Sequence, residues 1–346
     1  FRETNHRSQM AMGDGKCRTT PDLPWKTRFL LAAFCFGVDA SRRSNGTVNR
    51  RLMSLFDPKS PPSSSKAING VTSSDVTVDA SRNLWFRLYV PCSAADSRLP
   101  LIVYFHGGGF AFCTADSKPY HDFCCRLAAE LPAVVVSVNY RLSPEHRCPS
   151  QYHDGFDAHK FIDSSEAAVL KSNADLNRCF IAGDSAGGNI AHHVTLRAVG
   201  EEFGKLKVIG LVAMQPFFGG EERTESELRL KKAPLVNVER SDWMWRAFLP
   251  EGSDRNHEVT NLKSADISGV KFPSTIVIVG GFDPLQDWQR RYYEELKKCG
   301  KEVKLLEYPN AIHGFYGFPE LPESALLITE LRDFIPNQSA SASPTK

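Results

Sequence analysis

The sequence predicts an α/β protein whose central sheet is mostly parallel and covered by helices on both faces. Segments rich in β-branched and aromatic residues alternate along the chain with segments whose apolar residues recur at helical spacing. Residues 133–138 form a nearly continuous β-branched run, which is typical of a strand buried on both faces. Strands that alternate with helices favour one layered α/β domain.

The expected elements follow one another from residue 84 to residue 334. The predicted strands are residues 84–90, 101–105, 133–138, 179–182, 208–214, 275–279 and 303–307. The predicted helices are residues 120–131, 155–162, 186–198, 287–299 and 323–334. Residues 217–250 break this alternation, first with charged and then with aromatic residues. We interpret them as an insertion above the carboxyl ends of the strands, where α/β proteins place their sites.

The main domain is predicted to span residues 57–336. The segments on either side of it differ from it in composition. Residues 1–24 are predicted to be a disordered or tag-like leader, and residues 337–346 a disordered Ser- and Ala-rich tail. Residues 25–56 are predicted to be an N-terminal arm, with the apolar run 29–38 as an amphipathic helix docked on the body. A weak secretory signal is the alternative interpretation of this run. Residues 57–76, rich in Ser, Pro and Lys, are predicted to be a loop.

Composition excludes several classes of partner. The 346 residues include 42 basic and 40 acidic side chains, so a net charge of +2 provides no field for nucleic acid or anionic lipid. No apolar run reaches the roughly 18–20 residues that cross a bilayer. The nine cysteines are scattered without a C-x-x-C pair, which argues against zinc and disulfide frameworks. We expect a small molecule as partner, with no nucleic acid, no membrane and no metal. The expected location is the cytoplasm, with the nucleus as a further compartment, and the sequence carries no signal for oligomeric state.

The strongest chemical motif is Gly183-Asp184-Ser185-Ala186-Gly187, between a predicted strand and a predicted helix. This G-x-S-x-G pattern is typical of a nucleophile elbow, a tight turn that lifts the serine hydroxyl clear of the sheet. The turn requires small residues two positions before and after the serine, as Gly183 and Gly187 are. Ser185 is therefore the candidate nucleophile.

A second motif, His106-Gly107-Gly108-Gly109, follows the predicted strand 101–105. Bare backbone N–H groups can converge in such a loop, and we expect Gly107 and Gly108, with Ala186, to form an oxyanion hole. A phosphate cradle is the competing use of a glycine-rich loop, but no Walker lysine follows these glycines. His106 is expected to shape the loop rather than to act as a base.

A serine nucleophile requires a base, and the base is oriented by an acid. His313 follows the predicted strand 303–307 through a short loop and is the candidate base. Asp283 follows the strand 275–279 and precedes a proline, so it is the candidate acid. Asp287 is the alternative, although its position suits a helix N-cap. The chain order Ser185, Asp283, His313 is that of α/β hydrolases.

With these motifs the sequence resembles the hormone-sensitive-lipase-like branch of the α/β hydrolases. The resemblance rests on His106-Gly107-Gly108-Gly109, on the elbow, and on Asp283-Pro284-Leu285 with His313-Gly314-Phe315. The segment 140–145 (Tyr-Arg-Leu-Ser-Pro-Glu) is similar to another hallmark of the family, with Ser143 where alanine is usual. Residues 45–50 and the arm before them resemble plant carboxylesterases and the related gibberellin receptor.

The resemblance implies an N-terminal lid and cofactor-free hydrolysis of carboxylic esters. A non-catalytic hormone receptor is the main alternative. The receptor of this family lacks the triad histidine and has serine as the third residue after the histidine of its His-Gly-Gly motif. Here His313 is present, and the third residue after His106 is Gly109, so hydrolysis is favoured over a non-catalytic receptor function. The family also includes enzymes of specialised metabolism that assist elimination or cyclisation, which an intact triad does not exclude.

The substrate pocket has the weakest signal in the sequence. Phe34, Gly109, Phe110, Phe217 and Trp243 are the candidate substrate-binding residues, taken from the arm, the oxyanion loop and the insertion. Such a lining would suit an apolar acyl or aromatic group. The same residues would equally suit a core beneath the lid, and both interpretations remain open at this point.

Overall fold

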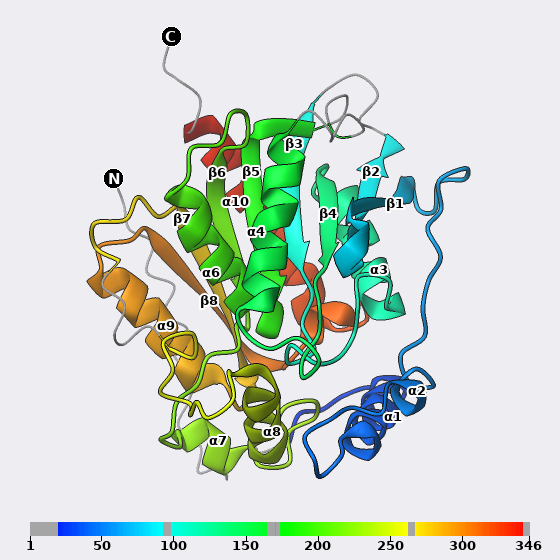
Figure 1. Cartoon of the computed structure of the whole chain (residues 1–346), viewed down its shortest axis with the longest axis vertical. Helices are drawn as coiled ribbons and strands as arrows, with labels where there is room; N and C mark the ends of the chain where they lie inside the picture. Colours follow the sequence, from blue (N-terminus) through cyan, green and yellow to red (C-terminus); the bar gives the residue numbers. More distant parts are fainter. Residues whose placement is uncertain (1–19, 93–97, 165–169, 171–173, 262–266, 342–346) are drawn as a thin grey trace.

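The computed structural model describes residues 20–92, 98–164, 170, 174–261 and 267–341. Its centre is an eight-stranded sheet with the order β1-β2-β4-β3-β5-β6-β7-β8 (Figure 1). The strands are β1 Val71–Asp79, β2 Leu84–Pro91, β3 Leu99–Phe105, β4 Val134–Asn139, β5 Ala174–Asp184, β6 Val208–Met214, β7 Ser274–Phe282 and β8 Val303–Ile312. β2 pairs antiparallel with β1 and β4, and the strands from β4 to β8 are parallel. The predicted, mostly parallel sheet is confirmed.

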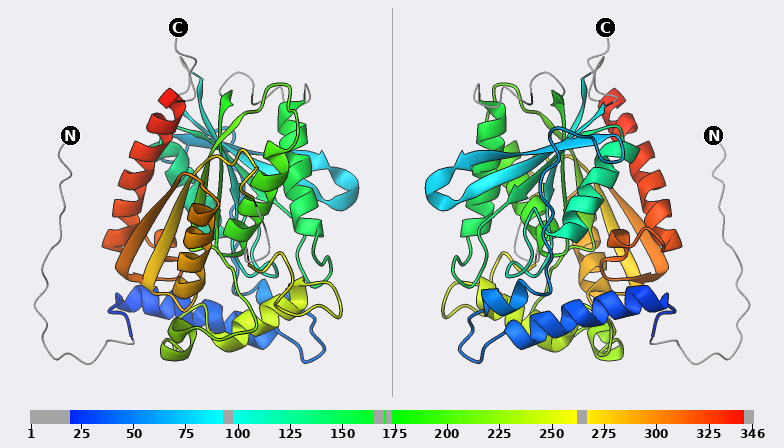
Figure 2. Two further views of the ribbon diagram at one scale, coloured as in Figure 1. Left: turned by 90° about the vertical axis from the view of Figure 1, so that its left-hand side faces the viewer. Right: turned by 90° about the vertical axis from the view of Figure 1, so that its right-hand side faces the viewer.

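Helices cover both faces of this sheet (Figures 1 and 2). On β3, Leu101, Val103 and Phe105 belong to the core of one face, and Ile102 and Tyr104 to the core of the other, as the two-residue period of a strand requires. The first face is covered by α4 (Ser150–Asp163) and α6 (Ala186–Val199), with α9 (Gln286–Lys298) farther along the sheet. The second is covered by α3 (Lys118–Glu130) and α10 (Pro322–Ser341).

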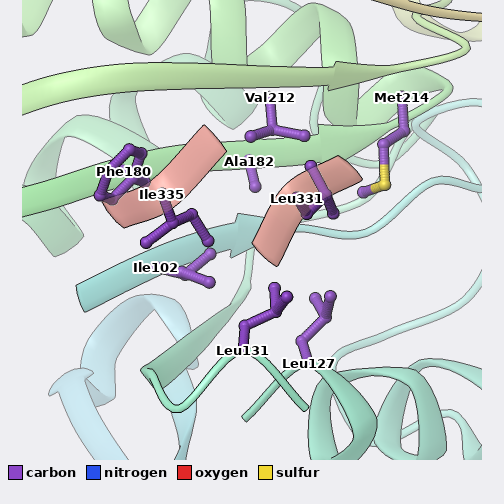
Figure 3. A pocket seen from close by; sticks show the side chains of 9 residues that line it. All are labelled: Ile102, Leu127, Leu131, Phe180, Ala182, Val212, Met214, Leu331 and Ile335. Carbon is purple, nitrogen blue, oxygen red and sulfur yellow. The ribbon is translucent and has the colours of Figure 1, made fainter. Parts of the chain in front are cut away.

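A small gap in the second core layer is lined by apolar side chains alone. Figure 3 shows it between β3, β5 and β6 on one side and α3 and α10 on the other. Its lining, which includes Ile102, Phe180 and Leu331, presents no polar group to a ligand. The gap is part of the hydrophobic core and is separate from the chemistry described below.

The N-terminal arm and the insertion meet at the carboxyl ends of the strands. The arm contains α1 (Trp25–Ser41) and α2 (Arg50–Met53), and the insertion contains α7 (Glu225–Arg229) and α8 (Val238–Phe248). Figure 2 shows α1 lying across this end of the molecule. Both oxygens of Asp39 on α1 accept hydrogen bonds from Arg240 on α8, at 2.8 and 2.5 Å. Val38 of α1 and Trp243 of α8 share one apolar cluster with Phe112.

Two predicted boundaries are wrong. The predicted loop 57–76 overlaps β1, which the sequence hides because Ser, Thr and Asp dominate an edge strand with one exposed face. The first part of the tail predicted to be disordered, residues 337–341, instead continues α10 to Ser341, and residues 342–346 lie outside the described residues. Within α10, the Ser339 hydroxyl is buried and donates to the carbonyl of Ile335 at 2.8 Å. Residues 1–19 of the predicted leader lie outside the described residues.

Among the described residues, no helix is both long enough and apolar enough to cross a membrane.

Candidate active site

Ser185 lies at the turn between β5 and α6. Its backbone has φ 51° and ψ −119°, an unusual conformation that the G-x-S-x-G motif predicts. The turn needs its glycines, since a Cβ on Gly187 would lie 2.0 Å from the carbonyl oxygen of Phe105. The Ser185 N–H donates to the carbonyl of Met214 at 2.9 Å, and the Ser185 carbonyl accepts from the N–H of Phe217 at 2.8 Å. The last residue of β6 and the segment after it thus fix the serine backbone on both sides.

His313 and Asp283 form a buried pair at the ends of β8 and β7. The imidazole Nδ1 lies 2.7 Å from Asp283 Oδ2. Because a carboxylate only accepts hydrogen bonds, Nδ1 carries the proton and Nε2 is left free to act as a base. Asp283 is fully buried and also accepts from Gln289 Nε2 at 2.7 Å and from the N–H of Leu285 at 2.9 Å. The carboxylate therefore has one fixed orientation toward the imidazole.

The electrostatic surroundings favour a basic imidazole. Burial alone would lower the pKa of His313, but the charge of Asp283 and the hydrogen bond to it outweigh burial and raise that pKa above its ordinary value. The carboxylate of Asp184 raises the His313 pKa further. His313 is thus prepared to take a proton near neutral pH.

Asp184, directly before Ser185, occupies the centre of a buried polar network. Its carboxylate accepts hydrogen bonds from three tyrosines, Tyr104 at 2.6 Å, Tyr120 at 3.0 Å and Tyr316 at 2.8 Å. Burial raises the pKa of Asp184, although these hydrogen bonds oppose the shift. Tyr316 lies three residues after His313, so the network links the serine turn to the histidine loop.

The structure corrects the expected oxyanion donors. The N–H of Gly107 donates to Asp184 Oδ1 at 2.8 Å and is therefore engaged in the network instead of facing an oxyanion. Gly108 and Gly109 follow in a loop where both residues have positive φ. Neither N–H has a hydrogen-bond acceptor among the residues that the structure describes. The available donors are accordingly Gly108 and Gly109, together with Ala186 at the first turn of α6.

Two other candidates have roles apart from the reaction. His106 is fully buried, stacks on Tyr140 at a ring distance of 4.3 Å, and burial lowers its pKa to about 4, so it shapes the loop as expected. The expectation that Asp287 caps a helix is wrong, because Leu285 holds that position in α9. Asp287 Oδ2 instead accepts from the N–H of Ser226 at 2.9 Å and so joins α9 to α7.

The candidate substrate-binding aromatics divide into two groups. Phe110 and Phe217 are almost completely buried in an aromatic cluster, where Phe110 stacks on Phe248 at 3.6 Å and Phe217 on Trp245 at 4.4 Å. These two rings are core residues beneath the site. Trp243 and the half-buried Phe34 pack where the arm meets the insertion. Above the oxyanion loop, the thioether of Met244 packs directly on Gly109.

Replacing Phe110 by Ala is expected to lower the free energy of unfolding by about 3–5 kcal/mol, the usual cost of deleting a buried phenyl ring. Urea unfolding followed by tryptophan fluorescence measures the change. Phe29→Ala is the matched control, since Phe29 is 67% exposed on α1, and its expected effect is within about 0.5 kcal/mol. Equal effects of the two substitutions would contradict the placement of Phe110 in the core.

One residue of the site has no sequence signal. Gln215 follows β6 and is fully buried, and its side-chain amide bonds to the backbone on both sides of His313. No motif includes it, because its partners lie almost a hundred residues away. Within the described ranges, no cluster of His, Cys, Asp and Glu side chains has the arrangement that a metal ion needs.

Comparisons with known proteins agree with this architecture. The family described as the alpha/beta hydrolase fold matches residues 102–317. A gibberellin receptor of Arabidopsis thaliana, GID1C, is 42% identical over 329 residues, which cover 90% of this chain and 94% of the receptor. Carboxylesterase 20 of the same plant is 38% identical, covering 78% of this chain and 86% of that protein.

Solved structures extend the similarity to microbial enzymes. The esterase of Pyrobaculum calidifontis superposes with a TM-score of 0.67 at 26% identity, covering 95% of this chain and 97% of the esterase. With the matched sheet, elbow and strand order, the chain belongs to the α/β-hydrolase fold family and is similar over most of its length to plant gibberellin receptors and carboxylesterases.

Proposed function

We propose that this protein is a serine carboxylesterase that hydrolyses small carboxylic esters without a cofactor. The observation that carries the proposal is the buried hydrogen bond of 2.7 Å between His313 and Asp283, at the same sheet edge as the Ser185 elbow. A histidine with a fixed tautomer is what a serine nucleophile needs for activation. The similarity to plant carboxylesterases and microbial esterases supports the same reaction class.

The reaction proceeds by two acyl transfers. His313 Nε2 takes the proton of the Ser185 hydroxyl while the serine oxygen bonds to the ester carbonyl carbon. The N–H groups of Gly108, Gly109 and Ala186 stabilise the oxyanion that forms. The alcohol leaves with the proton from His313, and an acyl-enzyme remains. Water, deprotonated by the same histidine, then releases the acid and restores the serine.

Hydrolysis of p-nitrophenyl acetate and butyrate by the full chain tests the proposal, together with labelling by a fluorophosphonate. A serine esterase should turn over at least one ester and lose that turnover when one phosphonyl group is bound per chain. Peptide mapping should locate the group on Ser185. A folded protein that neither hydrolyses these esters nor accepts the label contradicts the proposal.

The activity should depend on pH through His313. The imidazole acts as a base only when neutral, and its pKa lies above 6.5, so kcat/KM should fall as pH decreases through that raised pKa. The acid limb of a pH–rate profile should therefore have its midpoint above pH 6.5. Asp184→Asn removes a charge that raises this pKa and should move the midpoint downward. A wild-type midpoint at or below 6.5 would contradict this assignment of the base.

A small-molecule receptor is the second candidate function, and the outer face of α1 favours it. Trp25, Phe29 and Phe36 recur at helical spacing on this face and are 73%, 67% and 63% exposed. The inner face carries Leu31 and Val38, which are buried against the body. A helix that is apolar on both faces is typical of one that packs on two partners. The 42% sequence identity to a gibberellin receptor supports the same candidate function.

Calorimetric titration of a gibberellin into the Ser185→Ala variant separates the two candidates. A receptor binds the hormone at micromolar or lower concentration whether or not the nucleophile is present. A carboxylesterase with a different substrate shows ester turnover in the wild type and no heat of gibberellin binding.

A further inference from the structure

A short segment that no motif includes, residues 214–217 at the end of β6, contacts both the serine turn and the loop that carries His313. On one side, the Met214 carbonyl and the Phe217 N–H bond to the backbone of Ser185, at 2.9 and 2.8 Å. On the other side, the segment reaches the histidine loop through one side chain, that of Gln215.

The Gln215 amide is bonded to the two peptide groups that flank His313. Its Nε2 donates to the carbonyl of Ile312 at 3.1 Å, and its Oε1 accepts from the N–H of Gly314 at 2.8 Å. Donor and acceptor are both satisfied at a fully buried position, so the amide has a single favourable orientation. Because both contacts go to the backbone on either side of one residue, they fix the position of the Cα from which the imidazole extends.

The sheet is shaped to admit this side chain. Gln215 begins between β5 and β7, where its own N–H donates to the Ile278 carbonyl at 2.9 Å. To reach the end of β8, its side chain must pass over β7 at Gly280. A Cβ on Gly280 would lie 2.5 Å from Gln215 Nε2 and 2.8 Å from the backbone carbonyl oxygen of Ala311 on β8, so only glycine leaves room for both groups in this position. Gly280 and Gln215, which are far apart in the sequence, thus fit together at the point where the Gln215 side chain crosses β7.

We propose that Gln215 is a positioning residue that aligns His313 with Ser185 by holding the peptide groups of Ile312 and Gly314, and that Gly280 provides the passage for its amide. The expected loss of kcat rests on the proposed function, whereas the expected change in the position of His313 does not. Small errors of alignment are costly in catalysis, since a displacement of about 1 Å lowers rates by about 100-fold. Gln215 touches neither the Asp283 carboxylate nor the imidazole in the hydrogen bonds described, so it acts through the backbone.

Gln215→Met tests the proposal, because it keeps the length of the side chain and removes both hydrogen bonds. We expect kcat for p-nitrophenyl butyrate to fall by about 10- to 100-fold, with KM changed by less than about threefold. Gln151→Met is the matched control, since Gln151 is equally buried and donates to the backbone at Arg141 and His146 in a loop apart from the triad. The control should lose stability while its kcat stays within about threefold of the wild type.

Gly280→Ala tests the crossing point without removing a polar group. The added methyl should displace the Gln215 amide and reproduce most of the fall in kcat. In a double-mutant cycle with Gln215→Met, the two losses in kcat should be less than additive, because both substitutions disturb the contacts of the amide, and the remaining cost of Gly280→Ala reports its contact with the Ala311 carbonyl. Where Gln215→Met does not fold, Gln215→Asn replaces it: the amide group is kept, but the shorter side chain cannot reach both the Ile312 carbonyl and the Gly314 N–H.

A second readout keeps the inference separate from the proposed function. The proton on His313 Nδ1 gives a downfield NMR signal in histidine-labelled protein, identified by its loss in His313→Ala. This signal should shift or broaden in Gln215→Met and stay unchanged in Gln151→Met, even if the wild type proves inactive on every ester. An unchanged signal overturns the proposal, and so does a kcat within about threefold of a measurable wild-type value.

Discussion

Replacing Ser185 by Ala is expected to lower kcat for ester hydrolysis by about a million-fold, the loss seen when a triad serine is removed. The loss is large because the hydroxyl forms the bond to the substrate, and no neighbouring group can take its place. The Ser185 backbone bonds to Met214 and Phe217 are independent of the side chain, so the fold around the turn should remain. Stopped assays at high protein concentration measure the residual rate.

Two controls distinguish loss of chemistry from loss of structure. Ser143→Ala removes a buried hydroxyl that donates to the carbonyl of His146, at a position where alanine is usual in the family, and should leave kcat within about threefold. The double variant Ser185→Ala, His313→Ala should be no slower than either single variant, because serine and histidine act as one unit. Additive losses would mean that the two residues serve different steps.

The parts of the site that could be predicted from the sequence are those encoded locally. The elbow is a contiguous motif because the turn that exposes Ser185 needs its small residues within two positions of the serine. Asp283 and His313 were identifiable because each follows a strand, and the carboxyl ends of parallel strands meet at one edge of the sheet. The pairing of these two residues in the structure follows from that topology.

The parts of the site that could not be predicted depend on contacts between distant segments. Gly107 was expected to face an oxyanion, but its N–H is taken by Asp184, which is 77 residues away. Phe110 has the aromatic side chain that is expected of a pocket wall. Only the stacking of its ring on Phe248 shows that it belongs to the core. Gln215 resembles any polar residue after a strand until its two contacts across β7 are known. The sequence shows the type of each of these three residues, whereas their roles depend on contacts that form only in the folded chain.

Asp283→Asn is expected to lower kcat by about four orders of magnitude, through the tautomer of His313. The hydrogen bonds around Asp283 determine where the new amide group must lie. Oδ1 accepts from the backbone N–H of Leu285, which cannot rotate away, so the asparagine oxygen has to keep that position. Its NH2 group then takes the place of Oδ2, beside His313 Nδ1 and Gln289.

Gln289 can accommodate this exchange, because its Oε1 has no hydrogen-bond partner within the described part of the chain and a flip of its amide turns it into an acceptor. The imidazole cannot, since Nδ1 must now accept a hydrogen bond from the new NH2 group and Nε2 must carry the ring proton, which leaves no base facing the serine. The pH–rate profile and kcat of Asp283→Asn measure the loss, with Asp287→Asn as the control that should stay within about tenfold. The reverse ranking, with Asp287→Asn the slower variant, would transfer the acid role to Asp287, whose carboxylate the structure commits to Ser226 on α7.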